Sequence, residues 1–147
     1  MRIWRCFGGM PSGSLESRRV SLADHLERTN RFMIAFDLVL GSAAILAPAA
    51  TLRAIGHDPP SPDAEQLFRC FGPIWLTFAV AHALAARRGD SRDWWAVAWL
   101  RASEIGTDAL WSRSTAVRRP GARAALVTAG ASNLWMAVGF AWLARRR

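Results

Sequence analysis

The sequence predicts an all-α integral membrane protein, an antiparallel four-helix bundle preceded by a flexible N-terminal segment. Four apolar runs of about twenty residues are long enough to cross a bilayer as helices. Short polar loops join the runs, so successive helices are expected to be antiparallel neighbours. Arginines and tryptophans gather near the ends of the runs, as they do at membrane interfaces. The expected spans are residues 32–52, 67–86, 94–111 and 124–143.

A soluble all-helical domain is the competing fold. A modest mean hydropathy and the charges inside the runs favour it. However, a soluble helix shows a polar face of alternating charge, and three of the four runs lack one. We therefore expect the membrane bundle over residues 21–147, with residues 1–20 as a flexible basic segment that is not a convincing signal peptide.

The arginine and cysteine content limits the kinds of molecule that the protein can be expected to bind. All 19 basic residues are arginine, and the formal charge is +8. The arginines cluster at the ends of apolar runs instead of lining one face, so we exclude nucleic acid and expect membrane lipids. Cys6 and Cys70 form no CxxC pair and have no histidine at ligand spacing, so the sequence predicts neither a disulfide framework nor a metal site.

Capping signals define the first two helices. Ser21 followed by Asp24 predicts a helix start near Leu22, and Pro48 should kink or end that helix. Small residues at 41–44 offer a close helix contact. Turn formers fill 53–63, where Ser61 before a proline predicts the next helix start, and the segment 87–89 ends it with two arginines and a glycine.

The third run begins after an expected cap at Ser91 and carries three ionisable residues. Arg101, Glu104 and Asp108 are spaced by three and four residues, so they share one face of the helix. Charged groups in hydrocarbon turn toward a bundle interior, so this face should point inward. A break at 118–121 separates it from the last helix, expected from Ala124.

The other polar residues of the apolar runs fall into groups according to their expected depth in the membrane. Asp37 and His82 should lie toward the cytoplasmic side, and Arg69 with Asp108 toward the outer side, as structural polar pairs. Arg101, Glu104 and Asn133 should meet near the midplane, with Arg101 beside Glu104. These groups either fix helix packing or carry function, and the sequence leaves both open.

A ligand site is expected where deep aromatic and polar residues coincide. Trp99 and Trp135 are candidate walls of a pocket for a flat or isoprenoid ligand. The expected ligand-binding residues are Trp99, Arg101, Glu104, Asn133 and Trp135. Glu104 and Asp108 are the catalytic candidates if the protein is an enzyme.

Arginine counts near the helix ends predict orientation. The N-terminus, second loop and C-terminus hold about twelve arginines, and the first and third loops about six. The prediction is a multi-pass protein of the bacterial inner membrane with both termini in the cytoplasm.

The order of four residues along the first two expected helices and the loop between them matches the layout of a known family, and these residues are Pro48, Gly56, Arg69 and Gly72. A first helix ends near a proline, a loop carries a glycine and prolines, and the second helix opens with an arginine before a glycine. Over residues 32–143 this resembles the DoxX-like superfamily of small bacterial four-helix membrane proteins, many of them uncharacterised. The segment from Phe71 to Trp75 is also similar to the ergosterol-pathway membrane scaffold family. Some DoxX-like relatives are linked to quinone-dependent respiratory complexes.

Two functions follow as expectations. The first is a non-enzymatic membrane protein that binds a lipid, quinone or isoprenoid, or that acts as a scaffold subunit of a membrane complex. No cofactor is required, although a bound quinone or lipid is compatible with it, and a homo-oligomer stays open. The alternative is an intramembrane enzyme that moves protons on a lipid-like substrate, in the manner of an isomerase, through Glu104 or Asp108.

Overall fold

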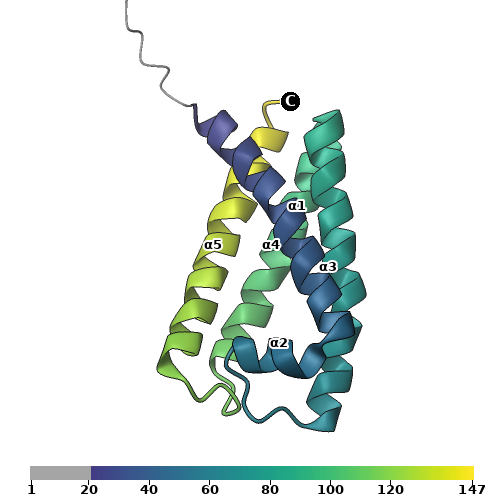
Figure 1. Cartoon of the computed structure of the whole chain (residues 1–147). Helices are drawn as coiled ribbons and strands as arrows, with labels where there is room; N and C mark the ends of the chain where they lie inside the picture. The colour runs from purple at the N-terminus through teal and green to yellow at the C-terminus, as the bar shows by residue number, and fades with distance from the viewer. Residues whose placement is uncertain (1–20) are drawn as a thin grey trace, which may run out of the picture.

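A computed structural model describes residues 21–147, and these residues form five α-helices and no strand. The expected flexible segment 1–20 lies outside the described residues. Four helices are long and one is short, which confirms the all-α class and adds one helix to the four that the sequence predicts (Figure 1). They are α1 (Leu22–Leu46), α2 (Pro48–Ala54), α3 (Pro62–Arg88), α4 (Ser91–Ser112) and α5 (Pro120–Ala144).

Three expected helix ends are confirmed. The Ser21 hydroxyl accepts from the backbone N–H of Asp24 at 3.1 Å, and the Asp24 carboxylate accepts from the N–H of Ser21, so two backbone donors at the start of α1 are satisfied. Ser61 caps α3 through the N–H of Ala64 at 3.2 Å. Gly89 ends α3 with a φ of 72°, a left-handed conformation that glycine adopts without steric cost.

The first run is two helices where the sequence predicts one over 32–52. The chain leaves helical geometry at Ala47, and α2 begins at Pro48. Proline lacks a backbone N–H and its ring fixes φ, so it suits the first position of a new helix better than the interior of a long one. Figure 1 shows α2 turned across one end of the molecule.

Two further boundaries differ from expectation. Asp90, not Ser91, is the N-cap of α4, and the Ser91 hydroxyl instead donates to the backbone oxygen of Ala144 at 2.6 Å. Helix α5 begins at Pro120, four residues before Ala124, because the proline of the expected break serves as the first helical residue.

The long helices pack in two pairs. Helix α1 lies along α3 and α4 lies along α5, and the pairs meet mainly between α3 and α4. Successive long helices run in opposite directions (Figure 1). The start of α1, the α3–α4 turn and the last residues of the chain therefore share one end, called here the turn end. Helix α2 and the loop before α5 form the opposite end, called the α2 end.

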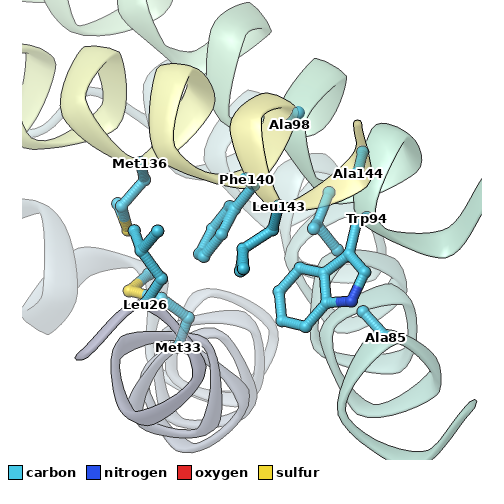
Figure 2. Packing of buried hydrophobic residues seen from close by; sticks show 10 residues of the cluster. Leu26, Met33, Ala85, Trp94, Ala98, Met136, Phe140, Leu143 and Ala144 are labelled. Atoms are coloured by element: carbon cyan, nitrogen blue, oxygen red, sulfur yellow. The ribbon is translucent and has the colours of Figure 1, made fainter. Parts of the chain in front are cut away.

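Two apolar clusters form the core. The cluster nearer the turn end packs Trp94 against Phe140, with ring centroids 5.6 Å apart, and adds Leu26 and Met33 from α1 (Figure 2). The cluster nearer the α2 end joins α1, α2 and α3. Its buried members are Ala44, Leu52, Phe68, Trp75 and Phe78.

Helices α1 and α3 touch through two glycines. A Cβ on Gly41 would lie 2.8 Å from the backbone oxygen of Gly72, and one on Gly72 would lie 2.9 Å from the oxygen of Gly41. Neither position tolerates a side chain at this separation, so the contact depends on the absence of both. The expected close packing of the small residues at 41–44 is confirmed at Gly41.

Three helices, α1, α3 and α5, are long and apolar enough to cross a membrane. Only between 22% and 33% of their most apolar windows is buried inside the protein, so most of this apolar surface faces outward. Helix α4, the expected span 94–111, is not among the three, and its sequence carries five charged residues.

Candidate functional site

A cluster of polar side chains is buried between the two apolar clusters. Asn30 and Asp37 come from α1, His82 from α3 and Arg101 from α4, and each is at most 2% exposed. The His82 ring meets Phe140 edge to face with centroids 5.8 Å apart, and the Arg101 guanidinium lies 5.2 Å from the centre of the Phe78 ring. The polar cluster thus comes from three helices, contacts α5 through Phe140, and touches both apolar clusters.

Hydrogen bonds connect all four residues. Arg101 donates through Nε to His82 Nε2 at 2.9 Å and through Nη2 to Asp37 Oδ2. Asn30 Nδ2 donates to the backbone oxygen of His82 at 2.9 Å, and its Oδ1 lies 2.5 Å from His82 Nδ1. Since arginine only donates, Nε2 of His82 is an acceptor, and the ring proton sits on Nδ1, where it donates to Asn30.

The charge of Arg101 is matched by Asp37 alone within this cluster. His82 Nε2 lies 3.8 Å from Asp37 Oδ2, which is too long for a hydrogen bond, and a neutral ring forms no ion pair. The second carboxylate oxygen of Asp37, Oδ1, is buried and has no partner among residues 21–147. The network therefore leaves one acceptor unused.

The structure does not bring Arg101 and Glu104 together as their spacing along the helix predicts. Arg101 forms its ion pair with Asp37, on another helix. Two features of helix geometry explain the difference. Side chains lean toward the helix N-terminus, so Arg101 leans away from Glu104, and an acid that follows a base is the weaker order for a pair within one helix.

The other polar residues that the sequence predicts for a site do not join the hydrogen-bond network of Arg101. The Trp75 indole donates to Glu104 at 3.4 Å, and the Asn133 amide donates to Asp108 at 2.9 Å. Arg69 is exposed and forms no ion pair with any described residue, so its expected pairing with Asp108 is wrong. Asn133 accordingly belongs with Asp108 and not with Arg101.

The two tryptophans expected to line a pocket face outward instead. Trp99 is 71% exposed and Trp135 is 43% exposed, and the latter contacts the edge of His25. Distance from the helix ends suggested that both were deep, but depth along a helix does not specify which face a residue occupies. Neither lines the pocket that the structure contains at the α2 end.

This pocket, which no pattern in the sequence predicts, is open and has a volume of about 450 Å³. Seven of its residues are apolar, and His57 and Thr107 supply the polar groups. Phe68 and Trp111 stand edge to face in its wall, with centroids 5.7 Å apart. The apolar residues are Leu52, Ala64, Leu67, Phe68, Phe71, Leu110 and Trp111. Residues of α3 and α4 form most of the wall, and Leu52 of α2 and His57 of the following loop complete it.

No family model, curated protein or solved structure matches the chain. Among residues 21–147, no three histidine, cysteine or acidic side chains gather closely enough to hold a metal ion. The resemblance to the DoxX-like superfamily stays a prediction.

Proposed function

We propose that the protein is an integral membrane protein in which all four long helices cross the bilayer, with α2 at one surface. The distribution of polarity supports this. Charged and amide side chains are buried in the centre, while large apolar side chains on every long helix are exposed, such as Val39, Val80, Leu110 and Val138. A soluble protein has the reverse arrangement, because exposed apolar patches of this extent favour association or a membrane.

Helix α4 fits as the fourth span once its faces are separated. Arg101 and Asp108 are buried against other helices, and Trp99 and Leu110 point outward. Ionisable residues in membrane helices face the bundle interior and find polar partners there. Arg101 has such a partner in Asp37, and Asp108 has one in Asn133. Arg101 and Asp108, two of the five charges that lower the hydropathy of α4, are thus not on the face that lipid would contact.

We further propose that the protein is not an enzyme and binds a hydrophobic small molecule, a lipid, quinone or isoprenoid, in the apolar pocket at the α2 end. One observation carries this proposal. The pocket combines an apolar, aromatic lining with two polar residues, His57 and Thr107, which is the usual composition of a small-molecule site. A ligand with a flat or branched apolar body and one polar end fits that lining.

The isomerase-like alternative lacks such support. A catalytic acid or base has to lie within hydrogen-bond reach of its substrate. Glu104 and Asp108 are not among the residues that line the pocket, and each accepts from a side chain of a neighbouring helix. A role as a scaffold subunit stays open beside ligand binding, because a large apolar surface suits protein partners as well as lipid.

Quenching of tryptophan fluorescence tests the binding proposal, because Trp111 lies in the pocket wall. Purified protein in detergent is titrated with decylubiquinone and, separately, with a brominated fatty acid. The ligand should quench a smaller part of the fluorescence in the variant Trp111→Phe, because that variant lacks the tryptophan in the pocket wall. Thr107→Phe, which fills the pocket, should weaken binding, whereas Ser103→Phe, one turn earlier on the exposed face of α4, should not. Equal quenching in all variants would refute the proposal.

A further inference from the structure

A second pocket lies at the turn end, opposite the apolar one. It encloses about 180 Å³ and is lined by polar residues from α1, the end of α3, the start of α4 and the end of the chain. Its charged or donor-bearing lining residues are Glu27, Arg31, Arg87, Arg88, Trp94 and Arg147. Four of these six are arginines, so the pocket is strongly basic.

Two of the arginines have no acidic partner among the described residues. Arg147 pairs with Glu27, and Arg88 reaches Asp93 only at 4.0 Å. Arg31 and Arg87 form no ion pair and donate no side-chain hydrogen bond within residues 21–147. Like charges held around one cavity repel each other, and an anion in the cavity would relieve that repulsion.

Trp94 provides an independent sign of a missing acceptor. The side chain is 1% exposed, and its indole Nε1 has no hydrogen-bond partner among the described residues. An indole nitrogen can only donate, and a buried donor without an acceptor is costly. In Figure 2 the nitrogen lies on the edge of the ring nearest Ala85, which also lines this pocket.

The surroundings indicate where such an anion would come from. At the same end, Arg146 lies over the Trp142 ring at 4.0 Å and Arg145 over the Trp95 ring at 5.7 Å. Tryptophan and arginine together are typical of the level of lipid headgroups. Arginine is also suited to phosphate, because its planar guanidinium can donate two parallel hydrogen bonds.

We propose that this pocket binds the phosphate group of an anionic membrane lipid, with Arg31 and Arg87 as its cationic partners and Trp94 Nε1 as a buried donor. The inference depends on the turn end lying at a membrane surface. It does not depend on the apolar pocket, which is at the other end and is tested with other ligands. Its failure therefore leaves the quenching experiment intact.

Native mass spectrometry of the detergent-purified full chain tests the proposal. The protein is titrated with phosphatidic acid, with phosphatidylcholine and with inorganic phosphate. We expect phosphatidic acid to be retained in preference to phosphatidylcholine. Arg31→Gln combined with Arg87→Gln should weaken retention about tenfold or more, as expected when charge-assisted hydrogen bonds are lost.

The matched control is Arg28→Gln combined with Arg92→Gln. These arginines are exposed at the same end and do not line the pocket, so the net charge falls equally. If this control variant retains as much phosphatidic acid as the native chain, the result supports a specific site. If both double variants lose phosphatidic acid equally, the proposal is overturned. Trp94→Phe removes the donor and retains an aromatic ring at this buried position, and it should weaken the retention of phosphatidic acid more than that of phosphatidylcholine. Competition by inorganic phosphate at equal concentration would overturn the assignment to a lipid.

Discussion

Arg101 donates from Nε to Nε2 of His82 across 2.9 Å, so this buried imidazole is neutral and is held by a charge that is itself paired elsewhere. The contact joins α4 to α3, and the second donor of the same guanidinium joins α4 to Asp37 on α1. One arginine therefore connects the two helix pairs of the fold. Its removal should affect the assembly of the pairs more than either pair alone.

Replacing Arg101 with leucine should strongly destabilise the protein. The change leaves the Asp37 carboxylate buried without a counter-charge, and the expected loss in free energy of unfolding is about 3–5 kcal/mol. The double variant Asp37→Leu with Arg101→Leu should lose clearly less than the sum of the two single variants. Unfolding of purified protein in mixed detergent, followed by circular dichroism, measures all three.

The exposed pair of Glu27 and Arg147 is the control for this cycle. Glu27→Gln should change the unfolding free energy by no more than about 1 kcal/mol, because a solvent-accessible ion pair contributes little. Strict additivity of the Asp37 and Arg101 substitutions would show that the buried pair is not energetically coupled.

The sequence predicts the helices well because the signals that begin and end them are local. Ser21, Ser61 and Gly89 act through neighbours within four residues, and each end is confirmed. Pro48 shows the limit of such signals. A proline can kink a helix, end it or begin the next, and contacts of α2 with distant residues such as Phe68 determine which occurs.

The pairing of the polar residues could not be predicted from spacing along the chain. The inward turn of Arg101 and Asp108 follows from the cost of charge in lipid, and both are buried. Their partners, however, depend on how helices rotate and approach one another. Asp37 is 64 residues from Arg101, and Asn133 is 25 residues from Asp108. Sequence separation carries no information on such contacts.

Replacing Asn133 with leucine should destabilise the contact between α4 and α5. Asn133 donates to Asp108 at 2.9 Å, and the carboxylate would lose its side-chain donor. The expected cost is about 1–3 kcal/mol in unfolding free energy, which is typical of an orphaned buried acceptor. Ser132→Ala, at the adjacent exposed position of α5, should have almost no effect. A similar loss in both variants would point to a general defect of α5 rather than to this bond.

Replacing Gly41 with alanine should separate α1 from α3. The new Cβ would lie 2.8 Å from the backbone oxygen of Gly72, and a backbone atom cannot rotate away. We expect a loss of about 1–3 kcal/mol, the usual range for overpacking. Gly106→Ala is the matched control, because a Cβ there meets nothing within 4 Å. That variant should be stabilised by about 0.5–1 kcal/mol, since alanine favours a helix over glycine. Thermal unfolding of the two variants should therefore shift in opposite directions.

Labelling of introduced cysteines tests the predicted orientation. The described part of the chain has eight arginines at the turn end and six at the α2 end, and arginine-rich ends stay in the cytoplasm. In a variant without Cys6 and Cys70, Asp90→Cys places a thiol in the α3–α4 turn, and Thr115→Cys places one in the loop before α5. A membrane-impermeant maleimide should label Thr115→Cys in intact spheroplasts and Asp90→Cys only after permeabilisation. The reverse pattern would invert the orientation, and labelling of both in intact spheroplasts would contradict a membrane-spanning bundle.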